Sequence, residues 1–347
     1  MSENINLDIS ENLLDERTKK TILNAIELSK ELLEASKLHL NAFLKTKEFP
    51  IDNICFIAVG SVGRYEAIKS SDFDLIPILK DTESLEKFKD IDKEGREYLK
   101  KKLERDISKG EDLTQCIDIE TLKSQDAIGT EKDNSSSLTK RILILTEGQQ
   151  AGGNYDIKSV KEELLNSYAS AQTTSGRHVL SLFNDIARYY RTLCIEYKSK
   201  IDTKDKDWCV RNMKLRHSRK FWYFSTMISI VKIAYDNPHG NEIYKQKLLE
   251  TLDFPPYKRM INSVKEYCPN SLAKLFERFA WFLDFMSEEN HRCELSKIEH
   301  DKRYENSLKN PFPGLKFNSD ILHESMVRII ESLPLDMKRK LMDWFLL

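Results

Sequence analysis

The residues with the clearest chemical potential lie in one stretch, GSVGRYEAIKSSDFDL, at residues 60–75. Gly60 has no β-carbon, so a phosphate or another backbone segment can approach it closely. Ser61 can offer its hydroxyl and its N–H to an anion, and we expect it to cap a short helix formed by VGRYEA. The turn therefore predicts a cradle for a phosphate group.

Two carboxylates follow this turn. Asp72 and Asp74 stand at alternate positions, so in a strand their side chains leave the same face, about 7 Å apart at the Cα atoms. Magnesium prefers oxygen ligands and usually binds between one or two carboxylates and substrate phosphates. A phosphate cradle that faces a carboxylate pair is the minimum equipment for metal-assisted phosphoryl or nucleotidyl transfer.

A third carboxylate normally holds the metal that activates the attacking oxygen. The segment LTQCIDIETL, residues 113–122, alternates, with Asp118 and Glu120 on one side and Ile117 and Ile119 on the other. This period predicts a sheet strand. We expect Asp118, at its centre, to be the third carboxylate, with Glu120 as the alternative.

Helices and strands in a regular order must position these groups. Residues 16–46 lack Gly and Pro and carry apolar residues at helical spacing, which predicts an amphipathic helix. The apolar run 54–59 and the segment FDLIPIL, 73–79, predict two strands on either side of the turn, and 82–108 predicts a charged helix. With the strand around Asp118, this order predicts a small mixed α/β sheet.

The second half of the chain has a different pattern. SLTKRILILTEGQQAGG predicts one more buried segment, Ile142–Leu145, ended by glycines. From about residue 155 onward there is almost no alternation, and long helical patterns predominate, most clearly at 180–200, 211–235 and 271–289. We therefore expect a domain boundary near residue 155, with an all-helical region after it.

Composition narrows the class of protein. Lys plus Arg (55) nearly balance Asp plus Glu (56), so no global charge draws the chain to DNA or to an anionic membrane. The six cysteines show no CxxC pair and no zinc-site spacing, which indicates reduced thiols in a cytoplasmic protein. The N-terminus is polar and acidic, unlike a signal peptide, and the longest apolar stretches are shorter than the roughly 20 residues of a membrane span. We expect no membrane partner.

The pattern of an apolar strand, Gly60-Ser61 and then Asp72-Phe-Asp74-Leu resembles the signature of the nucleotidyltransferase superfamily typified by DNA polymerase β. With Arg64 and Glu66 after the turn, the fuller string is most similar to the branch that contains the PII uridylyltransferases and the glutamine-synthetase adenylyltransferases, with related bacterial proteins. Weaker similarity in TKRILILTEG and NDIARYYRTL carries the resemblance to about residue 195. The chain has no phosphohydrolase signature of the HD type, which excludes a full bifunctional PII uridylyltransferase.

The resemblance implies a reaction in which an acceptor oxygen attacks the α-phosphate of a nucleoside triphosphate and pyrophosphate leaves. The cofactor would be Mg²⁺ or Mn²⁺. Arg64 would either contact a phosphate oxygen or pair with Glu66 or another acid. The implied residues are Gly60, Ser61 and Arg64 for the triphosphate, and Asp72, Asp74 and Asp118 for catalysis and the metal ions.

In fold class, the resemblance implies an α/β + α protein with a small mixed-sheet nucleotidyltransferase core. We expect an N-terminal helical segment over 1–49, a catalytic domain over 50–154 and a helical substrate- or acceptor-binding domain over 155–347. The acceptor hydroxyl could belong to a protein side chain, a small molecule or an RNA end. The helix at 16–46 could also contact a partner or form a dimer.

Two helical segments allow a functional and a structural interpretation. In NDIARYYRTL, Asp185 and Arg188 could form a salt bridge, or Arg188 and Arg191 could hold a phosphate or base in a cleft. KLRHSRKFWYF, residues 214–224, could bind RNA through phosphates and stacking, or form a helix with its basic face outside and its aromatic residues in the core.

Two rival functions follow from the same residues. One is an oligonucleotide second-messenger synthase of anti-phage defence, although such enzymes usually resemble G-S-x-x-R-G-T, where this chain has Tyr65-Glu66. The other is a non-catalytic nucleotide-binding or antitoxin-type interaction module. The non-catalytic module is favoured if Asp118 does not face Asp72 and Asp74.

Overall fold

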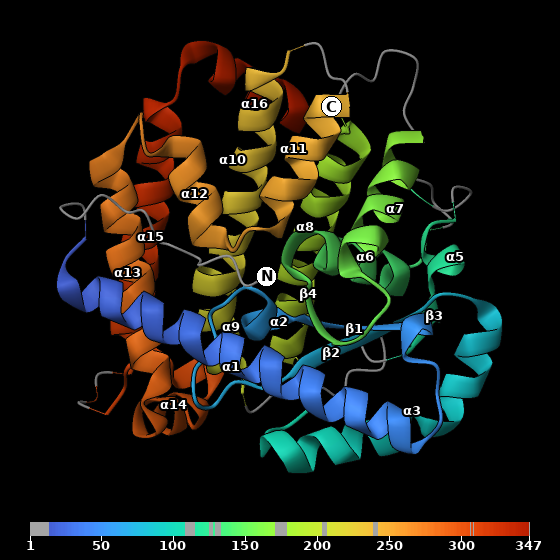
Figure 1. The fold of residues 1–347 in the computed structure, drawn as a ribbon. Coiled ribbons are helices and arrows are strands. Elements are labelled where there is room, and N and C mark those ends of the chain that lie inside the picture. The colour runs from blue at the N-terminus through green and yellow to red at the C-terminus, as the bar shows by residue number, and fades with distance from the viewer. Residues whose placement is uncertain are drawn as a thin grey trace. The chain divides into compact units, whose positions relative to one another are not determined.

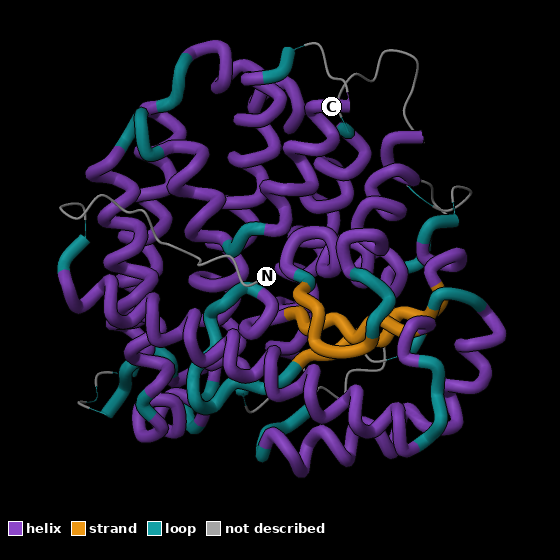
Figure 2. The backbone as a smooth tube through the Cα atoms, in the orientation of Figure 1, coloured by secondary structure: helices purple, strands orange, loops and turns teal. Residues whose placement is uncertain are grey.

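The structure is a computed structural model that describes residues 14–107, 115–124, 128, 133–170, 179–202, 207–238, 242–305, 307 and 309–346. It forms two compact units that interleave along the sequence. The first comprises Met1–Asn24, Tyr190–Asp236 and Pro256–Leu347, and the second comprises Ala25–Tyr189 and Asn237–Pro255. The described strands all lie in the second unit, in one small sheet, and helices make up most of the remainder (Figure 2). The domain limits expected at 49/50 and 154/155 stay a prediction.

The sheet of the second unit has the strand order β3-β2-β1-β4. β1 is antiparallel to both β2 and β4, whereas β2 and β3 are parallel, so the sheet is mixed. All six residues of β1 are buried, as expected for a central strand covered on both faces. The strands are β1 (Ile54–Val59), β2 (Asp74–Leu79), β3 (Ile117–Asp118) and β4 (Gln149–Gly153).

Helices cover this sheet (Figure 1). One face packs against α1 (Glu16–Thr46) and α3 (Thr82–Leu103), in a core that includes Phe56, Leu75 and Leu79 from the strands and Leu40, Phe43 and Phe88 from the helices. β1 also contacts α6 (Ser135–Glu147). The other elements of this unit are η1 (Ile51–Asn53), α2 (Gly60–Gly63), α5 (Ile119–Leu122), α7 (Ile157–Ser170), the start of α8 (Leu180–Asp202) and α11 (Glu242–Asp253).

Helices alone form the described part of the first unit. Its core contains α10, which is buried along most of its length, and α13 and α15, which contact each other. Phe221 packs on Phe279 with ring centroids 4.6 Å apart. The elements are α9 (Trp208–Lys214), the π-helical turn η2 (Leu215–Arg219), α10 (Lys220–Asp236), α12 (Pro256–Val264), α13 (Pro269–Ser287), α14 (Glu289–Ser296), η3 (His300–Lys302), α15 (Phe312–Ser332) and α16 (Leu335–Leu346).

The fold class expected from the sequence is confirmed, and so are the bounds of the first helix and the first strand. The apolar segment 142–145 is buried as expected, and it belongs to helix α6. Asn134 starts this helix by accepting a hydrogen bond from the N–H of Ser137 at 2.7 Å. The period of a short apolar run does not distinguish a strand from a helix. Here the cap at Asn134 marks the start of a helix.

The segment around Asp118 differs from the expected strand. β3 contains only Ile117–Asp118, and helix α5 starts at Ile119. The alternation of residues 113–122 is therefore not that of one continuous strand. In the described part of the chain, no helix has both the length and the apolar character needed to cross a membrane.

Candidate functional site

The turn after β1 brings Gly60 against a carboxylate. Gly60 has φ +71°, in the left-handed region that favours glycine. A β-carbon built on Gly60 would lie 2.2 Å from Oδ2 of Asp74, so this carboxylate takes the space that any side chain at residue 60 would need. The two residues meet because the antiparallel register pairs Val59 with Asp74. The structure thus brings together the turn and one of the two predicted carboxylates.

Ser61 has a different role from the expected cap. The short helix α2 begins at Gly60, and its N-cap is Val59, without a side-chain capping bond. Ser61 lies in the first turn, half-buried, and its carbonyl accepts a hydrogen bond from the N–H of Glu66 at 2.7 Å. Within the described residues its hydroxyl has no hydrogen-bond partner. This hydroxyl can therefore donate to a ligand.

Asp72 and Asp74 do not both lie in β2, because the strand begins at Asp74. Between them, Phe73 is fully buried in the core below α1 and α3. Since side chains alternate along an extended chain, Asp74 points away from that core, and Asp72 is expected to do so too. Asp72 is exposed and Asp74 is half-buried. The expected common orientation of the two carboxylates stays a prediction, because Asp72 lies before the strand.

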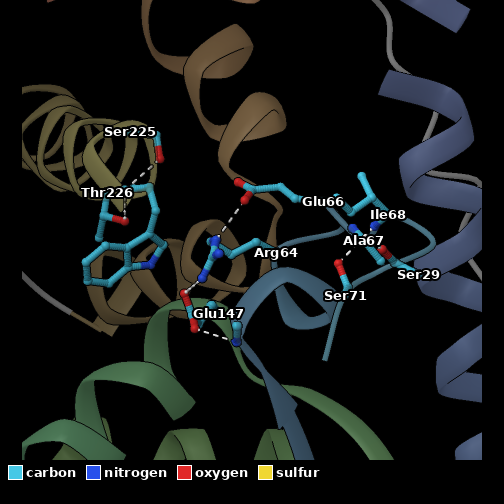
Figure 3. A network of polar contacts seen from close by, with 11 residues as sticks. Ser29, Arg64, Glu66, Ala67, Ile68, Ser71, Glu147, Ser225 and Thr226 are labelled. Atoms are coloured by element: carbon cyan, nitrogen blue, oxygen red, sulfur yellow. Dashed lines mark hydrogen bonds and ion pairs between the residues drawn. The ribbon is translucent and has the colours of Figure 1, made fainter. Parts of the chain in front are cut away.

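Arg105 holds the loop that leads to Asp72. Its guanidinium donates to three main-chain carbonyls, at 2.7–3.2 Å, of Ile68, Lys69 and Ser71. The Ser71 hydroxyl accepts from the N–H of Ile68 at 3.0 Å (Figure 3). Burial lowers the pKa of Arg105, and the negative charge of Asp72 opposes this fall. The loop is therefore fixed by a residue that also lies close enough to Asp72 to respond to its charge.

Arg64 lies in a buried ionic network instead of an open phosphate site (Figure 3). Its Nε donates to Glu66 at 3.0 Å and its Nη1 donates to Glu147 at 2.7 Å. The three side chains are 4%, 1% and 0% exposed. Burial by itself lowers the pKa of Arg64, but the charges of Glu147 and Glu66 outweigh burial and raise it. Of the two interpretations of Arg64, the structure shows the ion pair.

Glu147 also contacts the turn itself. Its Oε1 accepts a hydrogen bond from the N–H of Gly60 at 2.6 Å. One carboxylate thus binds the backbone of Gly60 and the side chain of Arg64. The sequence offers only a weak signal for this role, an acid after the apolar run TKRILILT and before Gly148.

Asp118 does not lie near the carboxylate pair. In the parallel register of β2 and β3, Asp118 is opposite Leu79, and Asp74 is at the other end of β2, about 16 Å away at 3.3 Å per residue. Leu79 belongs to the core below α1 and α3, whereas Asp74 points away from that core. Paired residues share a face, so Asp118 lies at the opposite end and on the opposite face. The expectation that it faces Asp72 and Asp74 is corrected.

The side chain of Asp118 is used locally. Its carboxylate accepts from the N–H of Thr121 at 2.9 Å and from the Thr121 hydroxyl at 2.8 Å, and so caps α5. Glu120, the alternative third carboxylate, pairs with Lys123 at 2.7 Å. A short polar side chain before a helix satisfies its first N–H groups. This local hydrogen bonding explains why an alternating pattern ends in a helix here.

The chain segment beside the carboxylate pair is Asp106–Ile107. Phe73 forms a parallel bridge with Ile107, and its N–H donates to the carbonyl of Asp106 at 2.8 Å. The Asp106 carboxylate pairs with Lys100 at 2.7 Å. Among the residues that the structure describes, no group of three Asp, Glu, His or Cys side chains could hold a metal ion. The described carboxylates at the turn are thus a pair, Asp72 and Asp74.

Asp185 and Arg188 belong to an ionic network in the second unit. Tyr168 donates its hydroxyl to Asp185 at 2.8 Å, and Arg188 lies 3.7 Å from Asp185 and 3.2 Å from Asp133. Arg141 also pairs with Asp133. Burial raises the pKa of Asp185. The salt-bridge interpretation of this segment is therefore the one that the structure shows.

The segment KLRHSRKFWYF comprises the last residue of α9, the turn η2 and the start of α10. Phe221 and Trp222 are buried, Tyr223 is half-buried, and Arg216 and Lys220 lie on a partly exposed face. This arrangement is the helix with aromatic residues in the core and its basic face outside. The side chains of Phe221 and Trp222 are thus inside the protein and cannot stack on RNA bases.

Comparison with known families gives a match to the N-terminal part of the chain. Residues 1–105 match the model of a family described as "Putative nucleotidyltransferase DUF294". No curated protein and no solved structure matches the chain. The matched range contains Gly60, Ser61, Arg64, Asp72 and Asp74 and ends before Asp118 and Glu147, and it does not distinguish the branches of the superfamily. The first third of the chain is thus similar to this family, and the resemblance to the nucleotidyltransferase superfamily is confirmed at that level.

Proposed function

We propose that this protein is a metal-dependent nucleotidyltransferase that transfers a nucleoside monophosphate from a nucleoside triphosphate to an acceptor hydroxyl, with release of pyrophosphate. One observation carries the proposal: the antiparallel register of β1 and β2 sets the carboxylate of Asp74 directly against Gly60. Asp72 would point to the same side of the chain as Asp74, since the buried Phe73 lies between them. The family match over residues 1–105 supports the same class of reaction.

The carboxylate pair fits a divalent cation. Asp72 and Asp74 offer hard oxygen ligands, and Mg²⁺ or Mn²⁺ typically needs only one or two carboxylates when substrate phosphates provide further oxygens. These two residues would hold the ion. When bound, it would stabilise negative charge on the phosphate that is being transferred.

The protein's own groups would hold the triphosphate. Gly60 leaves the space beside the turn to the carboxylate of Asp74, and the hydroxyl of Ser61, which has no hydrogen-bond partner among the described residues, would donate to a phosphate oxygen. Glu147 and Arg64 would keep the turn rigid, and Arg105 would keep the following loop in place. In the reaction, the acceptor oxygen forms a bond to the α-phosphorus while the bond to the pyrophosphate oxygen breaks, and the hydroxyl proton passes to a base or to solvent.

The acceptor is proposed to be a protein side chain or a small hydroxylated molecule, with an RNA end as a further alternative. The similarity to protein-modifying transferases favours a protein acceptor. The near balance of 55 basic and 56 acidic residues gives no general attraction to RNA.

A second candidate function is a nucleotide-binding module without catalysis. The position of Asp118 favours it, because the carboxylate expected to complete the metal site lies at the far end of β2 and caps a helix instead. In that case the turn and the carboxylate pair would bind a nucleotide and metal but transfer nothing.

Labelled nucleotides distinguish the two candidates. The protein is incubated with each α-³²P-labelled NTP and Mg²⁺ or Mn²⁺, together with a lysate of its own cells. Label should appear on a protein, an RNA or a small molecule with the wild type and with the exposed control Asp90→Asn, and should be absent with Asp72→Asn/Asp74→Asn. The double variant should keep its free energy of unfolding within about 1 kcal/mol. NTP binding by calorimetry without any transfer would instead support the binding module.

A further inference from the structure

Lys220, at the start of α10, is a half-buried lysine without an ion-pair partner among the described residues. Within the described residues its ammonium group has no hydrogen bond and no ion pair. Burial lowers its pKa, the charge of Arg216 lowers it further, and Asp320 opposes the change. Burying a charge without a partner is costly, so proteins seldom keep such a lysine without a reason.

Arg216 lies beside Lys220 on the same face. The two residues are four positions apart, the spacing at which helical side chains are neighbours, and the π-helical turn η2 lies between them. The Nε of Arg216 donates to Asn212 at 2.9 Å. Within the described part of the chain, its other guanidinium N–H groups have no partner. Two adjacent cations therefore have free donors.

The neighbouring groups do not neutralise this pair. Asp320 on α15, whose charge acts on Lys220, already pairs with Lys316 at 2.5 Å. His323 is a further basic group on α15, and burial and the charge of Lys220 lower its pKa. Its neighbour Glu324 pairs with Arg328 at 3.1 Å.

Two tyrosines complete the surroundings. Tyr190 and Tyr223 stack with ring centroids 4.1 Å apart, and Tyr223 is three residues after Lys220. Burial raises the pKa of Tyr223 to about 12, so its phenol stays neutral and adds no negative charge. Arg191 is close enough to influence this phenol. The charge around Lys220 thus remains positive.

We propose that Arg216 and Lys220 form a binding site for a phosphate group of a ligand. A guanidinium and an ammonium with free donors on one face are the usual protein partners of phosphate oxygens. Phe221 and Trp222 are buried, so bases cannot stack on them and the phosphate is the group recognised. This site lies in the helical unit, and it does not depend on the proposed transfer reaction.

The variant Lys220→Met tests the proposal, because Met fills a similar volume without charge. Its matched control is Lys232→Met, on the same helix, where the lysine already pairs with Asp236 at 2.6 Å. In phosphate-free buffer of low ionic strength, Lys220→Met should have a higher Tm than the wild type, since an unpaired half-buried charge is removed. Adding inorganic phosphate at constant ionic strength should raise the Tm of the wild type and of Lys232→Met, but not that of Lys220→Met.

Direct binding identifies the source of the phosphate. Calorimetry with inorganic phosphate and fluorescence anisotropy with a labelled 12-nucleotide single-stranded RNA are compared for the same variants. We expect Lys220→Met and Arg216→Gln each to weaken binding of at least one probe about tenfold, the loss expected for one charged hydrogen bond. Binding of phosphate alone would indicate a small phosphorylated ligand, and binding of RNA alone would indicate a nucleic-acid backbone. Equal affinities for wild type and Lys220→Met, or no binding of either probe, would overturn the proposal.

Discussion

The N–H of Gly60 donates to Oε1 of Glu147 at 2.6 Å, and this bond joins the turn after β1 to the last residue of α6. The same carboxylate binds Arg64 through its other oxygen. Because the Gly60 N–H is used inside the protein, the proposed phosphate contact rests on the hydroxyl of Ser61. The geometry of the turn is therefore maintained by a buried charge network and not by the turn sequence alone.

Replacing Glu147 tests this network. Glu147→Gln keeps an oxygen for the Gly60 N–H but removes the charge that Arg64 pairs with. We expect the free energy of unfolding to fall by about 2–4 kcal/mol, because Arg64 stays buried with only Glu66 as an acidic partner. Urea denaturation measures the change. A stability equal to that of the wild type would show that Glu66 alone is sufficient to balance Arg64.

Gly60→Ala tests the contact between the turn and Asp74. The new β-carbon would collide with the carboxylate of Asp74, and the alanine would have to keep the backbone at φ +71°. We therefore expect loss of nucleotide binding together with a fall in Tm. Gly314→Ala, in helix α15 with open space around it, is the matched control. The control should be unchanged or up to about 1 kcal/mol more stable. Nucleotide binding by Gly60→Ala at wild-type affinity would contradict the close packing described here.

We expect Asp118 to contribute to the stability of the fold and not to the transfer reaction. Asp118→Ala removes the cap of α5 and should lower the free energy of unfolding by about 1 kcal/mol, while Asp118→Asn keeps an oxygen for the Thr121 N–H and should lose less. Any transfer activity should stay within about twofold of wild type in both variants. A stable but inactive Asp118→Asn would contradict this purely structural role.

His217 predicts a pH dependence of stability. Its Nδ1–H donates to the carbonyl of Met213 at 2.9 Å, and its Nε2 accepts from the amide of Asn318 at 3.1 Å. Burial lowers the pKa of His217 from 6.5 to about 3. The hydrogen bond to Met213 and the charge of Asp320 oppose this fall, whereas the charges of Lys220 and Arg216 add to it. The unfolded chain takes up this proton below pH 6.5 and the folded protein only near pH 3.

The free energy of unfolding should therefore fall as the pH decreases from about 6.5 to about 3, and this histidine contributes about 1.4 kcal/mol per pH unit. Urea denaturation at several pH values measures the slope. His217→Gln should be less stable at neutral pH. Its free energy of unfolding should depend less steeply on pH, by the uptake of one proton, which is about 1.4 kcal/mol per pH unit. An unchanged slope in His217→Gln would mean that His217 is protonated in the folded protein.

Local sequence determined the parts of the protein whose signals lie within a few residues. The apolar spacing in α1, the uninterrupted apolar run of β1 and the pairing of Gly60-Ser61 with Asp72 and Asp74 each predict their structure without distant contacts. The Gly60 turn is predictable because a glycine is needed where a backbone or an anion approaches closely.

Only the tertiary structure decided which charged groups meet. Arg64 and Gly60 contact Glu147 across 83 and 87 residues of sequence, and no periodicity carries information over that distance. The pairing register of β3 with β2 determined where Asp118 lies. There its carboxylate caps α5. Alternation predicts which residues of a strand share a face, but strand register and strand length depend on pairing, and a capping side chain can end a strand where the pattern continues.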